Sequence, residues 1–198
     1  MADEPDPLLR RAIARVGLLN FGYFGVEFAV AISIGSVSLF ADSVDFLEDA
    51  SVNLLILLAL GWSLRWRVRT ATLLAFLILV PGLTTLWTAW LKFSEPVAPA
   101  PTPLTLAGAG AFVVNLVCAL MLAKHRHHDS SLVKAAFLSA RNDVLANVAI
   151  VLAGLVTAFL WHTAWPDLIV GLGIAAINVG AAKEVYDAAR EEHRQAEA

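Results

Sequence analysis

The sequence has little cysteine and little charge. Its one cysteine, Cys118, lies in an apolar run, which excludes an intrachain disulfide and every cysteine-rich metal motif. Charged residues make up 16% of the 198 residues, whereas soluble domains average about 25%. Hydrophobic residues make up 59% even before glycine is counted, and the mean hydropathy is +0.71. This composition indicates an integral membrane protein surrounded by a lipid bilayer, with no nucleic-acid partner.

The apolar residues form segments long enough to cross about 30 Å of hydrocarbon. The start, MADEPDPLLRR, is acidic and unlike a cleaved signal, so we expect the first segment to be retained. The predicted fold class is all-α, a polytopic membrane protein with a membrane domain at 13–186 between short tails at 1–12 and 187–198. Its six predicted transmembrane helices lie at about 13–34, 37–64, 70–91, 103–123, 132–160 and 167–185.

Basic residues are distributed unevenly between the two sides of these spans. Twelve Lys and Arg residues flank the spans on the side of the termini, whereas Lys92 is the only one on the opposite side. Because cytoplasmic loops carry the excess of Lys and Arg, we predict that both termini are cytoplasmic. The expected location is the plasma (inner) membrane of a bacterium.

The second span contains an unusual group of acidic residues. Asp45 and Asp49 are spaced i, i+4, so they stack one turn apart, and Asp42 lies on the same stripe. Like charges at this spacing repel, and a carboxylate inside hydrocarbon costs about 3 kcal/mol or more. A bound cation would offset this cost most directly. The alternative is that one or two of these groups are protonated, capped or placed at the mouth of the helix.

The fifth span carries polar residues that could complete a cation site. Ser139, Asp143 and Asn147 are spaced i, i+4, i+8 and therefore share one helical face. The second and fifth spans cross the membrane in opposite directions, which places Asp49 and Asp143 within a few turns of the midplane. We therefore predict an oxygen-rich site for a divalent cation between them. Interhelical hydrogen bonding is the alternative role for the serine and the asparagine.

For several other polar residues the sequence gives weaker evidence of a functional role. Glu27 in the first span is either a proton-relay or accessory group beside the site, or a snorkelling or protonated carboxyl. The loop between the fourth and fifth spans has three histidines that could capture metal or simply be solvated: His125, His127 and His128. Nothing resembles a paired nucleophile and base, so we expect no enzyme and no cofactor. Aligned carboxylates would also serve a cation channel or a proton-conducting pore.

Three stretches resemble the cation diffusion facilitator family. GSVSLFADSVDFLED is similar to its second-span signature, with Asp45 and Asp49 at the ligand positions. Ser139, Asp143 and Asn147 fall on the fifth-span pattern, and WPDLIVGLGIAAINVGAAKEV resembles the sixth span. The resemblance implies a divalent-metal/proton antiporter that exports metal from the cytoplasm, with two ligand positions on each of two helices. It also implies a homodimer.

Two departures from the family pattern affect these expectations. Ser139 stands where zinc-selective members have His or Asp, and an all-oxygen site tolerates harder ions such as Mn²⁺. Zn²⁺ remains the expected substrate, with Cd²⁺, Co²⁺, Fe²⁺ and Mn²⁺ as alternatives. Family members usually continue into a cytosolic metal-sensing domain. Since the sequence ends about a dozen residues after the sixth span, we expect a short member without that domain.

Overall fold

The computed structural model describes residues 7–59, 83, 85–124 and 131–177, with the backbone alone described at 58–59 and 131–139. Every regular element in these ranges is a helix, which confirms the all-α prediction for this part of the chain. Shorter helical segments cover residues 85–94 and Trp165–Ile177. The four long helices are α1 (Pro7–Ile34), α2 (Val37–Ala59), α4 (Pro101–Ala123) and α5 (Ser131–Phe159).

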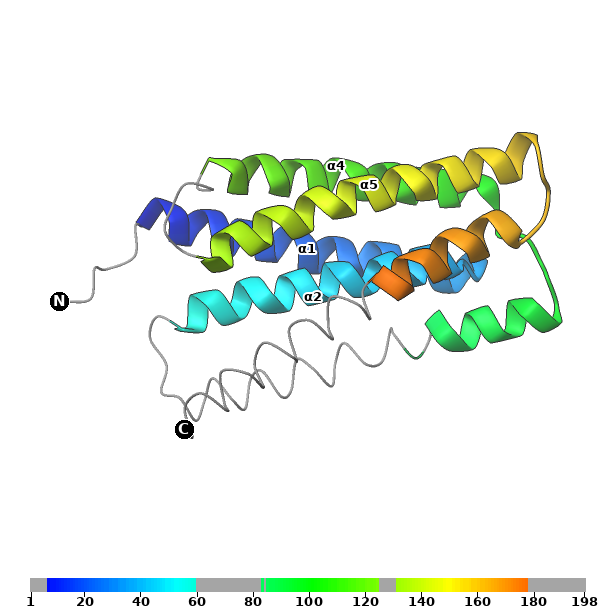
Figure 1. Ribbon diagram of the computed structural model, residues 1–198, viewed down its shortest axis with the longest axis horizontal. Helices are drawn as coiled ribbons and strands as arrows, with labels where there is room; N and C mark the ends of the chain where they lie inside the picture. Colours follow the sequence, from blue (N-terminus) through cyan, green and yellow to red (C-terminus); the bar gives the residue numbers. More distant parts are fainter. Residues whose placement is uncertain (1–6, 60–82, 84, 125–130, 178–198) are drawn as a thin grey trace, which may run out of the picture.

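The four long helices form a bundle (Figure 1). Only Gly35 and Ser36 join α1 to α2, and Gly35 has a φ of +61°, a left-handed conformation that glycine adopts without steric cost. This tight turn, which the sequence predicted, makes the two helices antiparallel neighbours. Helix α4 packs against α5 and α1, and α2 packs against α5. The second and fifth spans are therefore in contact, as the predicted site requires.

Several helix boundaries differ from the prediction. Helix α1 begins at Pro7, so residues 7–12 extend the helix and do not form a separate tail. Proline suits this first helical position because its missing N–H would have no helical partner there. The short helix at 85–94 runs past the predicted end of the third span at 91 and includes Lys92. Most of the predicted third span lies outside the described residues.

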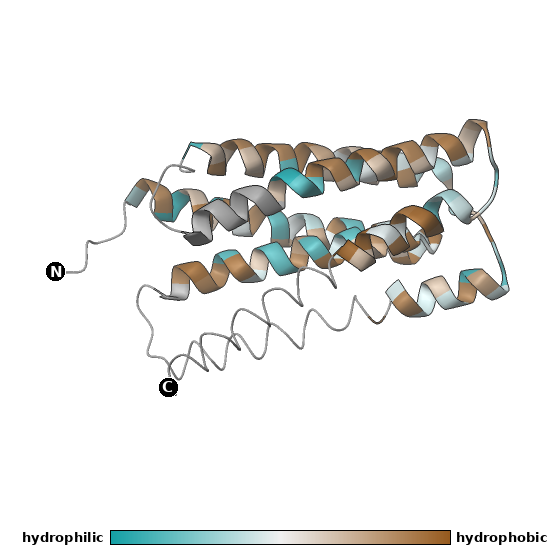
Figure 2. Ribbon diagram, in the orientation of Figure 1, coloured by the Kyte–Doolittle hydropathy of each residue, from teal (hydrophilic) through white to brown (hydrophobic). Residues whose placement is uncertain are grey.

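The bundle is apolar outside and partly polar inside. Large side chains such as Leu18 and Leu120 are more than half exposed, and much of the ribbon of these helices has the brown colour of hydrophobic residues (Figure 2). Asn20, Glu27 and Asn147, by contrast, are fully buried. Within the described residues three helices are long and apolar enough to cross a membrane: Pro7–Ile34, Pro101–Ala123 and Ala140–Phe159. The chain is an integral, polytopic membrane protein.

One buried carboxylate joins three helical elements at the end of the bundle where α2 begins. Both oxygens of Asp167 are used. Oδ1 accepts hydrogen bonds from the hydroxyls of Ser36 and Ser38, each at 2.6 Å, and from the Ser38 backbone N–H at 3.1 Å. Oδ2 accepts from the Val37 N–H at 2.8 Å and from Lys92 Nζ at 3.0 Å. These bonds connect the start of α2 to the 85–94 helix and to the Trp165–Ile177 helix.

Candidate metal site

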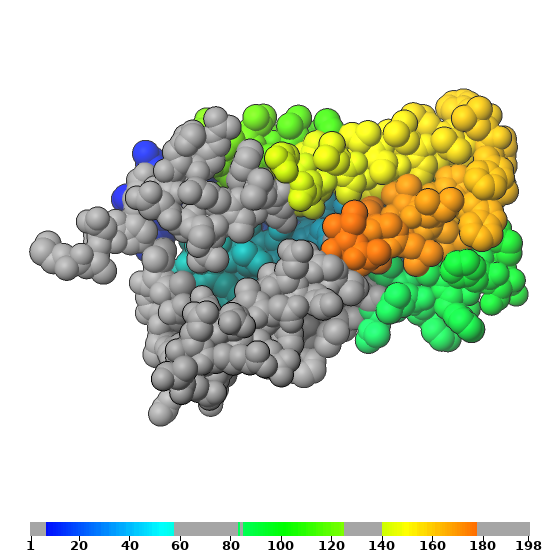
Figure 3. All heavy atoms as spheres, in the orientation of Figure 1, coloured from blue at the N-terminus to red at the C-terminus, as the bar shows by residue number. Residues whose placement is uncertain are grey.

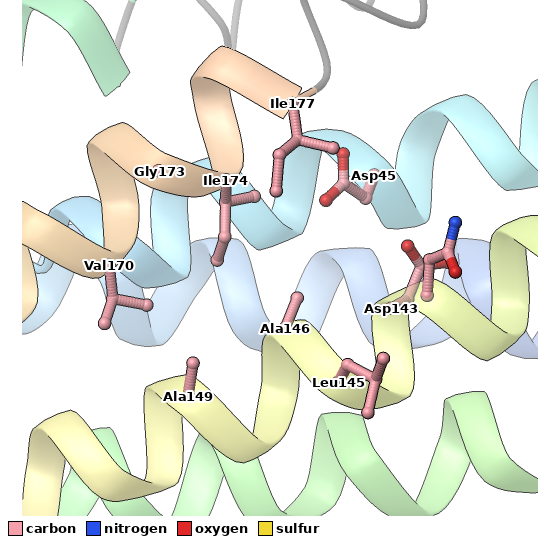
Figure 4. Close-up of a pocket in the computed structure, with 10 residues that line it drawn as sticks. Asp45, Asp143, Leu145, Ala146, Ala149, Val170, Gly173, Ile174 and Ile177 are labelled. Carbon is pink, nitrogen blue, oxygen red and sulfur yellow. The ribbon is translucent and has the colours of Figure 1, made fainter.

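A cavity of about 450 Å³ lies between α2, α5 and the Trp165–Ile177 helix. Asp45 of α2 and Asp143 of α5 contribute carboxyl groups to its wall, and Asn142 contributes an amide. Most of the other lining side chains are aliphatic. Figure 4 shows the two carboxyl groups at the same end of the cavity, away from Ala149 and Val170. Two helices that are distant in sequence therefore bring negative charge to one space inside the membrane domain.

The third predicted carboxylate, Asp49, does not line this cavity. Its Oδ2 accepts a 3.4 Å hydrogen bond from the Asn20 amide of α1, and the Asn20 carbonyl accepts from the Cys118 thiol at 3.5 Å. Asp49 is nevertheless near enough for its charge to interact with those of Asp45 and Asp143. Among the described residues, no three His, Cys, Asp or Glu side chains converge closely enough to hold a metal ion.

Asn147 is buried in a hydrogen-bonded chain that crosses three helices. Its Nδ2 donates to Asp42 Oδ2 at 2.6 Å, and its Oδ1 accepts from the Asn115 amide of α4 at 3.0 Å. Since the amide oxygen is already used, this arrangement favours the packing role that the sequence left open. Asn147 holds α5 against α2 and α4 beside the carboxylates.

Glu27 faces this polar group from α1. Its carboxyl lies near enough to that of Asp42 for their charges to interact. Three of the four oxygens of these two buried carboxyl groups have no hydrogen-bond partner: Glu27 Oε1, Glu27 Oε2 and Asp42 Oδ1. The sequence suggested an accessory role for Glu27 but gave no sign that it meets Asp42.

Some predicted site residues cannot be placed. Ser139 lies in α5 one turn before Asp143, but its side chain is not described. The three loop histidines at 125, 127 and 128 lie outside the described residues. The contacts of Asp167 with Lys92 were not anticipated, because the two residues are 75 positions apart and share no local pattern.

The space-filling view shows where the cavity lies on the molecule. Atoms of α5, in yellow, and of the Trp165–Ile177 helix, in orange, adjoin each other over α2, in cyan (Figure 3). Because α2 has four acidic residues, it is not among the apolar spans identified above. The cavity therefore reaches the helix that carries these four acidic residues.

Comparison with known proteins identifies the family. The family model of the cation efflux transmembrane domain matches residues 13–192. The cation-efflux pump FieF of Escherichia fergusonii is 30% identical over 159 residues, which cover 71% of this chain and 51% of that protein. The pump of the same name from Escherichia coli matches to the same extent. The chain thus spans about half the length of these curated relatives. It belongs to the cation diffusion facilitator family, whose members are membrane transporters and not enzymes.

Proposed function

We propose that this protein exports a divalent metal cation from the cytoplasm in exchange for protons. The observation that carries the proposal is the cavity between α2 and α5, to which Asp45 and Asp143 both contribute a carboxyl group. Family membership and the similarity to proteins named as cation-efflux pumps support it. Carboxylates brought together in a low dielectric repel one another, and a divalent cation relieves that repulsion.

The proposed ligands are Asp45, Asp49 and Asp143, with Ser139 or a water molecule in the remaining position. Asp49 would have to move towards the cavity or act through the electrostatic field, because it does not line the wall in this conformation. A site built from oxygen ligands accepts Zn²⁺ as well as harder ions. We propose Zn²⁺ as the principal substrate, with Cd²⁺, Co²⁺, Fe²⁺ and Mn²⁺ as competitors.

Exchange for protons follows from the chemistry of the ligands. Carboxylates must lose their protons to bind metal, so metal and protons compete for the same groups. Metal affinity should therefore fall as pH falls. A proton gradient directed into the cytoplasm would then promote release of metal on the outer side.

The test is metal uptake into proteoliposomes under a pH gradient, comparing the wild type with Asp45→Asn, Asp49→Asn and Asp143→Asn. Each variant keeps the shape of the side chain but removes a charge. Removing even a supporting partner of a metal ligand typically costs about 10–100-fold in affinity, so we expect losses of at least that size. Glu95→Gln is the control, because Glu95 is exposed and lies beyond the 85–94 helix.

Normal uptake by Asp143→Asn would contradict a site shared by α2 and α5. Uptake that does not saturate and ignores the pH gradient would indicate a channel.

A further inference from the structure

Glu27 and Asp42 form a pair of carboxyl groups apart from the metal cavity. Both side chains are 0% exposed, and neither lines the cavity that Asp45 and Asp143 share. Glu27 comes from α1 and Asp42 from α2, so the pair spans a helix interface. Among the described residues, the one hydrogen-bond donor to this pair is Asn147 Nδ2, at 2.6 Å from Asp42 Oδ2.

Within the part of the chain that the structure describes, no positive charge is among the charges that act on the pair. The nearby Tyr23 hydroxyl donates its proton to the backbone carbonyl of Ala107 at 2.7 Å, so that proton is already used. The titratable groups whose charges act on the pair are Tyr23 of α1, Asp45 and Asp49 of α2, and Asp143 of α5. Glu48 of α2 acts in turn on Asp45 and Asp143, and Cys118 of α4 lies near Asp49 and Asp143. All of these groups are acids.

Two ionised carboxylates in this setting would be strongly unfavourable, because both are fully buried and three of their four oxygens have no donor. One shared proton removes a negative charge and allows one carboxyl group to donate to the other. Among the described residues, no polar group takes the place of that proton.

We propose that Glu27 and Asp42 form a proton-binding site, separate from the metal cavity, that carries a proton exchanged for the metal. This inference rests on the proposed function for the exchange, but the presence of the proton can be tested without metal. In the metal-free protein the pair holds one proton. When a divalent cation enters the cavity, the O–H bond breaks, the proton passes to water, and both groups become carboxylates.

The geometry supplies a connection between the two sites. Asp42 lies one helical turn before Asp45, and Asn147 lies one turn after Asp143. The hydrogen bond between Asn147 and Asp42 joins these two turns across the interface. A cation between Asp45 and Asp143 therefore stabilises the ionised pair through its charge, while Asn147 continues to donate to Asp42. Protonation of the pair on the return step weakens metal binding by the same linkage.

The test uses Glu27→Gln in the full-length protein, with calorimetric titration of Zn²⁺ in two buffers of different ionisation enthalpy. This measurement gives the number of protons released for each metal ion bound. We expect the variant to bind Zn²⁺ within a few-fold of the wild type but to release about one proton fewer for each ion bound. Asp42→Asn should give the same loss.

Glu48→Gln is the matched control, because it removes a half-buried acid from the same helix, α2, and Glu48 is not among the groups whose charges act on the pair. An equal loss of released protons in this control would overturn the assignment to Glu27 and Asp42. So would an unchanged proton count in Glu27→Gln.

Infrared spectroscopy of the metal-free protein separates this inference from the proposed function. A protonated carboxyl band should be present in the wild type and should lose intensity in Glu27→Gln. Absence of the band from the wild type would refute the proton pair even if metal transport is confirmed. If the band is present but no metal is bound or transported, the proposed function fails and the proton site remains.

Discussion

Position 139 decides whether the proposed site contains a nitrogen ligand. Serine offers only a neutral hydroxyl, whereas histidine would place an imidazole one turn before Asp143. Because imidazole favours Zn²⁺ over harder ions, we predict that Ser139→His raises the affinity for Zn²⁺ relative to Mn²⁺ by about tenfold or more. Competitive metal binding to the purified protein measures this ratio.

Ser33→His is the control for this change, because Ser33 is exposed near the end of α1. An unchanged ratio in Ser139→His would mean that position 139 does not face the metal. Ser139→Ala should reduce binding much less than Asp143→Ala, since water can replace a hydroxyl.

Helical spacing predicted which residues share one face of a helix better than it predicted which residues of neighbouring helices they contact. Asp45 lies on the side of α2 that meets Asp143, whereas Asp49, which the i, i+4 rule grouped with Asp45, does not line that cavity. The same rule grouped Asn147 with the ligands, but its amide binds Asp42 and Asn115. Spacing within one helix does not reveal which donors a neighbouring helix presents, and that is why the contact between Glu27 and Asp42 was also missed.

At the scale of elements, the Trp165–Ile177 helix approaches α2 very closely at Gly171. A Cβ there would lie 2.7 Å from the backbone at Val37 and Ser38, which cannot move aside as a flexible side chain could. We predict that Gly171→Ala lowers the free energy of unfolding by about 1–3 kcal/mol, as overpacking does. Thermal unfolding in detergent is the measurement.

Gly173 in the same helix provides the comparison. A Cβ at this position meets nothing within 4 Å, so Gly173→Ala should be neutral or stabilising by up to about 1 kcal/mol through helix propensity. Equal destabilisation by both changes would show that the close approach at Gly171 does not limit packing.

The elements themselves were largely predictable, because long apolar runs and the Gly-Ser turn act locally. The residues at which the helices begin and end were harder to predict. The start of α1 at Pro7 depends on a capping preference rather than on hydropathy. Lys92 is accommodated in a buried position of a helix because the Asp167 carboxylate neutralises its charge. The two residues are 75 positions apart, so the local sequence around Lys92 does not predict this contact.

For the molecule as a whole, the uneven distribution of Lys and Arg predicts that both termini are cytoplasmic. A reporter enzyme that is active only in the cytoplasm, fused after residue 198, should therefore be active. A reporter active only outside the membrane should be silent at this position. The reverse result would invert the topology and with it the direction of the proposed export.

The Asp167 cluster also constrains how the chain is assembled during synthesis. All five donors to this carboxylate precede it in the sequence, so the ammonium of Lys92 emerges 75 residues before its partner. At about 5–20 residues per second, this interval lasts about 4–15 s. A lone ammonium is costly within hydrocarbon, so it would remain near the membrane surface during that time. The last described helix therefore completes the ion pair of an earlier one, and neutralisation of the buried Lys92 ammonium has to wait for Asp167.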